Sequence, residues 1–105
     1  MSHAPVRLVV VDGESMLPTL EPGDRLLVLR LAPRVGDVVA IDHAGLVKVK
    51  RVTAIDGSLV TVLGDNPSAS TDSRTFGPVH RSTIIGRAVY RYAPRDRAGR
   101  IPLRP

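Results

Sequence analysis

The side chains of this 105-residue sequence that could act in hydrolysis are its serine hydroxyls, with a histidine or a lysine as their base. A serine hydroxyl becomes a good nucleophile only when a neighbouring base takes its proton, and histidine is the usual base. His3 lies near the chain terminus, His43 stands in a turn beside an Ala-Gly pair, and His80 ends a polar segment. None of these positions indicates a base held beside a serine.

Lysine is the other possible base, but its pKa must fall well below the ordinary value. With an unperturbed pKa near 10.4, only about one lysine amine in a few thousand is neutral at pH 7. A fall of roughly 2 to 3 in the pKa, worth about 3 to 4 kcal/mol, is needed for catalysis near neutrality. Burial beside apolar side chains and a hydroxyl group is a plausible source of that fall.

The segments that must position these groups are short, apolar and rich in branched side chains. Turn signals at residues 21–24, 35–37, 56–58 and 64–67 separate them, which predicts an all-β domain. Within residues 46–52 apolar and polar side chains alternate, so Lys48 and Lys50 share one strand face. The predicted strands cover residues 6–11, 25–29, 37–41, 46–55, 59–63 and 84–92.

Helical structure is expected to be minimal. Only residues 15–20 could hold a helical turn, and Pro18 keeps it short. Residues 66–77 are polar and small, which predicts a surface loop. A loop of about a dozen residues is long for a compact domain, and such loops are usually functional or disordered.

Three stretches of the chain resemble the type I signal peptidase family. Gly13-Glu14-Ser15-Met16-Leu17-Pro18-Thr19-Leu20, followed by Pro22-Gly23-Asp24, is similar to the segment that carries the family's nucleophile. Val49-Lys50-Arg51-Val52 is similar to the strand that carries its lysine base. Gly64-Asp65-Asn66, Ser70 and Asp72-Ser73-Arg74 are similar to its last signature. Order and spacing agree over residues 9–90, so the resemblance implies a signal-peptidase-like antiparallel β domain, a fold shared with LexA.

The resemblance implies a role for five side chains of the site. Ser15 would attack the scissile carbonyl, Lys50 would take its proton, and Ser70 would hydrogen-bond and orient the lysine. Lys48 would then be a structural neighbour. Asp72 would form a structural ion pair with the arginine two residues later, Arg74, and a buried pair there would hold residues 66–77 against the active-site strands.

Further positions follow from the same resemblance. Asp65 and Asn66 would be structural residues near the site. Many members have a serine two residues before the nucleophile, but this chain has Gly13, so the oxyanion hole would be built from main-chain donors at Gly13 and Ser15.

The substrate would bind extended, as an added strand. Met16 and Leu17 are candidates for its side-chain pocket, with core packing as the alternative.

Composition predicts the wider organisation. Residues 6–92 would form the catalytic domain, and residues 93–105 a solvated tail rich in Pro and Arg. Six of the fifteen basic residues lie in the last nineteen positions, so the net charge of +5 indicates this tail and not a nucleic-acid site. No apolar run is long enough to span a membrane, which predicts a cytoplasmic protein without stable membrane insertion. The absence of cysteine and the scattered histidines predict no metal or other cofactor.

Within the family, residues 23–24, 36–39, 49–51, 64–67 and 72–79 are most similar to small soluble proteases that mature nickel-type superoxide dismutase. That likeness implies a precursor protein as partner, whose N-terminal leader is removed. Two alternatives stay open. One is a self-cleaving LexA-like repressor domain, although no Ala-Gly or Cys-Gly precedes Val6. The other is a non-catalytic peptide-binding β domain, against which the retained Ser15, Lys50 and Ser70 weigh.

Overall fold

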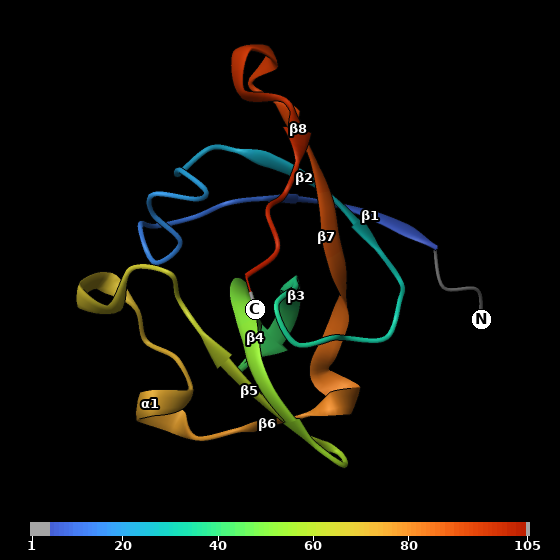
Figure 1. The fold of residues 1–105 in the computed structure, drawn as a ribbon, viewed down its shortest axis with the longest axis vertical. Helices are drawn as coiled ribbons and strands as arrows, with labels where there is room; N and C mark the ends of the chain where they lie inside the picture. Colours follow the sequence, from blue (N-terminus) through green and yellow to red (C-terminus); the bar gives the residue numbers. More distant parts are fainter. Residues whose placement is uncertain (1–4, 105) are drawn as a thin grey trace.

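The computed structural model describes residues 5–104, and within them the chain forms an eight-stranded antiparallel sheet with the strand order β1-β2-β7-β3-β4-β5-β6 (Figure 1). The eighth strand, β8, pairs with β7 outside that path. The bounds are β1 (Val6–Val10), β2 (Arg25–Leu29), β3 (Val38–His43), β4 (Leu46–Asp56), β5 (Leu59–Leu63), β6 (Val79–His80), β7 (Ile84–Ala93) and β8 (Gly99–Arg100). The predicted all-β class is confirmed.

Strand β3 lies between β7 and β4 and is covered on both faces. Its residues Val38 and Ala40 belong to one buried apolar cluster, and the alternating residues Val39 and Ile41 belong to a second cluster. A strand covered on both faces has a continuous apolar sequence, as this one has. Because β4 pairs with β3, with Val39 opposite Lys50, the start of β4 is held against the centre of the molecule.

The first cluster includes side chains from the turn that follows β1. Met16 and Leu20 are both buried in it, and the Leu20 N–H donates to the Met16 carbonyl oxygen at 3.0 Å. The sequence allowed one helical turn here, whereas the structure has a hydrogen-bonded turn that is not a helix. The apolar anchors fix the turn that carries Ser15 to the core.

Residues 66–77 contain more structure than the predicted loop. They hold a 3₁₀ turn, η1 (Pro67–Ala69), and a four-residue helix, α1 (Ser73–Phe76). The Asp72 carboxylate caps this helix by accepting from the Arg74 N–H. Within residues 5–104 no helix is long and apolar enough to cross a membrane.

The described part of the C-terminal region, residues 93–104, differs from the solvated tail that the composition predicts. The chain passes through a 3₁₀ turn, η3 (Arg95–Arg97), and β8 pairs back onto β7. Ile101 packs against the first cluster, and Arg97 forms an ion pair with the buried carboxylate of Asp24. The composition of a segment does not show which of its arginines pair with distant acidic residues. It therefore gave no sign of the pair between Arg97 and Asp24, which lie 73 residues apart in sequence.

Candidate active site

Ser15 opens the turn after β1, and a loop about 50 residues later in the sequence holds this turn by hydrogen bonds. The Asn66 N–H donates to the Ser15 carbonyl oxygen at 2.8 Å, and Asn66 Nδ2 donates to the Glu14 carbonyl oxygen at 3.1 Å. Thr19 Oγ1, at the far end of the turn, donates to Asp65 Oδ2 at 2.6 Å. Asp65 and Asn66 thus contact the turn that carries Ser15, near the site as the sequence predicts.

Asp65 is itself held by a buried arginine that sequence reasoning did not single out. Arg51 Nε and Nη2 donate to the two carboxylate oxygens of Asp65 at 3.2 and 2.7 Å, and both side chains are almost fully buried. Burial opposes the charged form of Asp65, but hydrogen bonds from Arg51 and Thr19 outweigh it and lower the pKa of the carboxyl. The only sequence signal for Arg51 is its place directly after Lys50.

Lys50 is buried on the opposite face of β4, with 4% of its surface exposed. Its Nζ donates to Ser70 Oγ at 3.3 Å. Burial lowers the pKa of the Lys50 amine; the carboxylate of Asp72 raises it in part, and the cations Lys48 and Arg74 lower it further. The structure therefore brings together the lysine and the serine that the sequence predicts to orient it.

Asp72 has no exposed surface and collects the donors around it. Ser70 Oγ donates to its Oδ2 at 2.5 Å, the Gly64 N–H donates to the same oxygen at 2.8 Å, and Arg74 Nε donates to Oδ1 at 3.0 Å. Burial would raise the pKa of Asp72, but hydrogen bonds from Arg74, Ser70 and the Gly64 N–H hold it far below its usual range. The expected pair with Arg74 is present, although 43% of the Arg74 side chain is exposed.

Gly64 lies where the two halves of the site come closest, and sequence reasoning gave it no role. A Cβ at this position would clash with Ser70 Oγ and would lie 2.6 Å from the Ser15 carbonyl oxygen. A side chain here would therefore separate the Ser15 turn from the Ser70 hydroxyl. The signal for this close approach was the glycine of the Gly64-Asp65-Asn66 segment.

Ser15 and Lys50 line the same cavity, of about 240 Å³. Within residues 5–104 no hydrogen bond joins these two side chains, and the Lys50 amine donates to Ser70. Catalytic hydrogen bonds are often long in a free enzyme and shorten when substrate binds. The lining residues are Val10, Asp12, Gly13, Glu14, Ser15, Leu46, Val47, Lys48, Val49, Lys50, Ala69 and Thr71.

Two residues at the start of the turn, Gly13 and Ser15, line this cavity. Gly13, which lines it, has a φ of +75°, and a Cβ there would meet no atom within 4 Å. The Ser15 N–H makes no hydrogen bond to any other residue that the structure describes. This N–H can therefore donate to an oxygen atom of a bound peptide.

The prediction that Met16 lines a substrate pocket is wrong. Only 1% of Met16 is exposed, and it packs in the first cluster, which was the alternative role for it. Leu17 is half-buried but does not line the cavity. The apolar side chains of the lining come instead from Val10 in β1, from Leu46, Val47 and Val49 in β4, and from Ala69.

His43 and His80 do not line this cavity. The ring of His43 stacks on Phe76 with 4.2 Å between the ring centroids. His80 caps the 3₁₀ turn η2 (Arg81–Thr83), since its Nδ1 accepts from the Ser82 N–H at 3.1 Å. His3 lies outside the described residues. Among residues 5–104 no three His, Cys, Asp or Glu side chains are placed to hold a metal ion.

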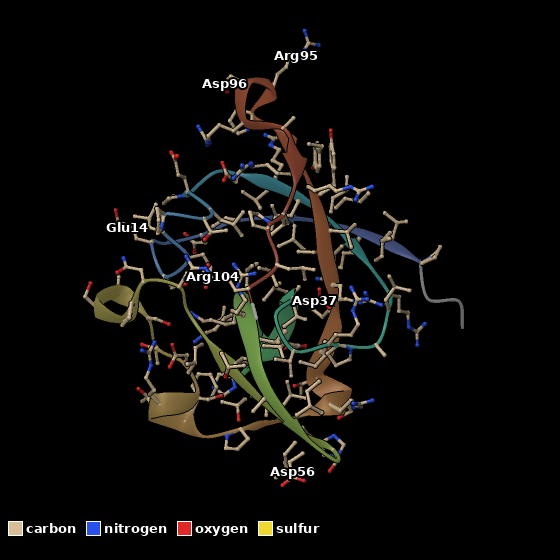
Figure 2. The ribbon with its side chains drawn as sticks, viewed as in Figure 1. Glu14, Asp37, Asp56, Arg95, Asp96 and Arg104 are labelled. Atoms are coloured by element: carbon tan, nitrogen blue, oxygen red, sulfur yellow. The ribbon has the colours of Figure 1, made fainter. Side chains whose placement is uncertain are left out.

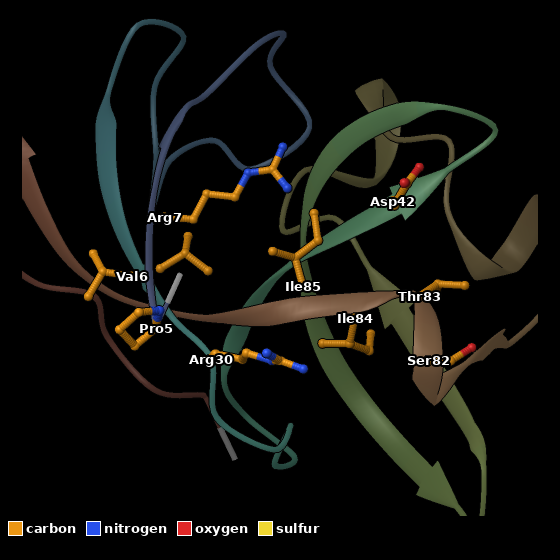
Figure 3. Close-up of a pocket in the computed structure, with 10 residues that line it drawn as sticks. Pro5, Val6, Arg7, Arg30, Asp42, Ser82, Thr83, Ile84 and Ile85 are labelled. Carbon is orange, nitrogen blue, oxygen red and sulfur yellow. The ribbon is translucent and has the colours of Figure 1, made fainter. Parts of the chain in front are cut away.

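A larger hollow, of about 500 Å³, lies at the start of β1 and β7 (Figure 3). Arg7, Arg30, Asp42 and Ser82 contribute its polar atoms, and Ile84 and Ile85 contribute apolar surface. Among the lining residues Ser82 is the one whose hydroxyl bonds to a histidine ring, that of His80, but Nδ1 of this ring also accepts from the Ser82 N–H in the cap of η2. The smaller cavity therefore remains the better candidate for the active site.

Comparisons with known proteins identify relatives of this chain. The model of the Peptidase S24-like family matches residues 2–89. A signal peptidase I of Leptolyngbya laminosa is 30% identical, over 87% of this chain and 70% of its own length. The mitochondrial ATP-independent inner membrane protease subunit 1a of Arabidopsis thaliana is 36% identical, over 85% of this chain and 71% of its own. A probable signal peptidase I-1 of Synechocystis sp. is 28% identical, over 87% and 73%.

Proposed function

We propose a serine/lysine mechanism on the premise that this chain belongs to the Peptidase S24-like family and is a serine endopeptidase of the signal peptidase I kind. In this proposal Ser15 is the nucleophile and Lys50 is its general base. One observation carries the assignment. The buried Lys50 amine, whose pKa burial lowers, lines the same cavity as the Ser15 hydroxyl.

The mechanism uses the neutral amine of Lys50. Ser15 Oγ forms a bond to the scissile carbonyl carbon while its proton passes to Lys50 Nζ, and the oxyanion accepts a hydrogen bond from the Ser15 N–H. The C–N bond then breaks as the Lys50 ammonium returns a proton to the leaving amine. Water then gives a proton to the same amine and bonds to the carbonyl carbon of the ester on Ser15. The bond from that carbon to Ser15 Oγ breaks, Oγ takes the proton back from Lys50, and the acid product leaves.

Ser70 orients the amine in this proposal. Its hydroxyl proton is directed to Asp72, so its oxygen accepts from an N–H of Lys50 at 3.3 Å. With one N–H fixed in this way, the lone pair of neutral Lys50 can turn towards the proton of Ser15. The nearby Asp72 carboxylate also stabilises the ammonium that forms, which limits how far burial lowers the pKa of Lys50.

The substrate of this site is an extended peptide. β1 pairs only with β2, and within residues 46–50 of β4 the edge away from β3 is not paired with β5, whose partners begin at Arg51. Both stretches line the cavity. A peptide strand could therefore hydrogen-bond to these edges, and the valine and leucine side chains around the cavity suit short apolar side chains near the cut.

The precursor of a nickel-type superoxide dismutase is the substrate that we propose, with removal of its N-terminal leader in the cytoplasm. Support comes from the likeness of residues 64–67 and 72–79 to the proteases of that maturation. The relatives named above are a signal peptidase, a probable signal peptidase and an inner membrane protease subunit by their printed names, which agrees with cleavage of a precursor. Cell fractionation with an antibody against the chain tests the location.

The experiment incubates the purified chain with that precursor and, separately, with a quenched fluorescent peptide that has Ala one and three residues before the cut. We expect one new N-terminus by mass spectrometry, and no product with Ser15→Ala. Ser58→Ala is the matched control, because Ser58 is exposed in the β4–β5 turn. Full activity of a folded Ser15→Ala variant would refute the mechanism, and cleavage of the peptide but not of the precursor would refute the substrate.

Self-cleavage is a distinct outcome of the same experiment, since self-cleaving LexA-like domains also belong to this family. A chain that shortens itself without added substrate, at a rate independent of its own concentration, would favour that function. An intact chain that cleaves many peptide molecules supports the endopeptidase.

A further inference from the structure

We infer that residues 101–104 form a strap that positions the nucleophile, acting through Arg51 and Asp65. The inference rests on the proposed function, because it assigns a purpose to contacts that end at the Ser15 turn. After β8 the chain runs back over β4, and Figure 2 labels Arg104 there. Arg104 lines a cavity together with Arg51 and Asp65.

The strap is attached at both ends. Ile101 packs against the first cluster, and its N–H donates to the Val89 carbonyl oxygen at 3.4 Å. The Arg104 N–H donates to the Gly36 carbonyl oxygen at 3.1 Å. A Cβ at Gly36 would clash with the Arg104 carbonyl oxygen, so the two backbones lie in direct contact. The segment is therefore a fixed part of the fold.

Between these attachments the strap completes the hydrogen bonding of Arg51. Arg51 Nη1 donates to the Pro102 carbonyl oxygen at 2.5 Å and to the Gly36 carbonyl oxygen at 2.9 Å. Nε and Nη2 of the same guanidinium donate to Asp65. A planar guanidinium with acceptors on three sides has one orientation, and the strap supplies one of those acceptors.

Asp65 passes this constraint to the nucleophile. It accepts from Thr19 Oγ1, four residues after Ser15. A second contact holds the same residue, since Arg91 Nη1 donates to the Thr19 carbonyl oxygen at 3.0 Å and Arg91 Nε donates to the Arg97 carbonyl oxygen at 2.6 Å. Both the side chain and the main chain of Thr19 are thus connected to the C-terminal region of the chain.

The base is held separately from the strap. Lys50 contacts Ser70, and Ser70 contacts Asp72, with no hydrogen bond from residues 101–104 to any of the three. Release of the strap should therefore misplace Ser15 without changing the surroundings of the amine. We expect kcat to fall, while KM and the pH at which activity rises stay near their wild-type values.

The first test compares two substitutions within the strap, with the quenched peptide as substrate. Ile101→Ser removes the core anchor, whereas Leu103→Ser changes a side chain that is largely exposed. We expect Ile101→Ser to lower kcat about tenfold or more, because displacement of a reacting group by about 1 Å is costly, and Leu103→Ser to match the wild type. Activity is expressed per folded molecule, with folding followed by circular dichroism.

A second, milder pair guards against unfolding. Arg104→Pro removes the N–H that donates to Gly36, and Arg104→Ala keeps it. Each of these substitutions is also made in an Arg51→Lys background. A lysine at position 51 cannot hydrogen-bond to Asp65 and Pro102 together. If the strap acts through Arg51, Arg104→Pro lowers kcat in the wild type but adds little in the Arg51→Lys background.

The outcomes separate this inference from the proposed function. Wild-type kcat in folded Ile101→Ser and Arg104→Pro, with only a lower melting temperature, would reduce the strap to a stability element and overturn the inference. Additive losses with Arg51→Lys would also overturn it. An active Ser15→Ala variant, in contrast, would overturn the proposed function itself.

Discussion

Lys50 and Arg51 are neighbours in β4, equally buried, and surrounded in opposite ways. Arg51 has an acceptor for each of its three nitrogen atoms: the Asp65 carboxylate and the carbonyl oxygens of Gly36 and Pro102. Lys50 has one side-chain hydrogen bond, to the neutral hydroxyl of Ser70, and its negative neighbour Asp72 is already bonded to Arg74. Because successive residues of a strand face opposite sides, two adjacent cations can meet such different surroundings.

The difference shows what burial does to a cation. A buried charge with matched partners keeps its charge and braces the structure, as Arg51 braces the loop of Asp65. A buried amine without a dedicated carboxylate loses part of the stabilisation of its charged form, and the pKa of Lys50 falls. One face of β4 thus provides rigidity, and the other provides a candidate base.

The most severe test replaces Lys50 by arginine. Arginine stays charged at any working pH and cannot accept the serine proton. Lys50→Arg should therefore be as inactive as Lys50→Ala, with kcat lower than that of the wild type by about a thousandfold or more. Peptide cleavage from pH 6 to 10, with circular dichroism to confirm folding, is the measurement. Wild-type activity should rise with pH, because the neutral amine of Lys50 is the active form.

Lys48→Arg is the matched control for that substitution. Lys48 is on the same strand face, and its Nζ lies 5.7 Å from the centre of the Phe76 ring. Arginine can keep this contact, so we expect Lys48→Arg to stay active. Activity of Lys50→Arg with loss of activity in Lys48→Arg would exchange the roles of the two lysines.

Arg51 should matter for the stability of the fold as well as for the position of the Ser15 turn. Arg51→Met leaves the Asp65 carboxylate buried without its partner, which should lower the free energy of unfolding by about 3 to 5 kcal/mol. Urea unfolding followed by circular dichroism measures the change. Arg81→Met is the control, since Arg81 is exposed and its side chain makes no hydrogen bond or ion pair within residues 5–104. Equal midpoints for the two variants would contradict the bracing role of Arg51.

The fold could be predicted to a large extent from local patterns. Strands β2, β4 and β5 lie where apolar residues alternate or cluster between turn signals, because a strand pattern is local in sequence. The return of the C-terminal region could not be predicted in this way. It depends on Ile101 reaching the core and on Asp24 pairing with Arg97, and no local pattern encodes such distant partners.

The candidate site shows the same limit. The resemblance identified Ser15, Lys50 and Ser70. In the structure Ser15 and Lys50 line one cavity, and Ser70 hydrogen-bonds to Lys50. Alternation predicted only the strand face of Lys50, since periodicity contains no information on the opposite wall. The assignment of Met16 to a pocket was wrong because an apolar residue in a turn can face either the core or a groove, and only packing decides between them.

A smaller effect is expected on the base side from Ser70→Ala. The variant keeps the Lys50 amine but removes the acceptor of its hydrogen bond, so we expect cleavage to fall by about ten- to a hundredfold without being abolished. Ser68→Ala is a matched control, because Ser68 is exposed and bonds only to the Asn66 side chain among the described residues. Wild-type turnover of Ser70→Ala would remove Ser70 from the mechanism.

The smallest effect should come from the charge of Lys48. The charged groups around the Lys50 amine are Asp72, which favours the ammonium, and Lys48 and Arg74, which disfavour it. Lys48→Met removes one repelling cation, so the pKa of Lys50 should rise and the rising limb of kcat/KM should move to higher pH.

Lys48→Arg keeps the positive charge and should leave the limb where it is. Because the proposed base itself is unchanged, the activity of Lys48→Met on the high-pH plateau should equal that of the wild type, and only the position of the limb should differ. Profiles from pH 6 to 10 at low and high salt make the comparison, since added salt screens the charge of this half-buried side chain and should bring the profiles closer. An unmoved limb, or one displaced to lower pH, would show that the charge of Lys48 does not lower the pKa of Lys50.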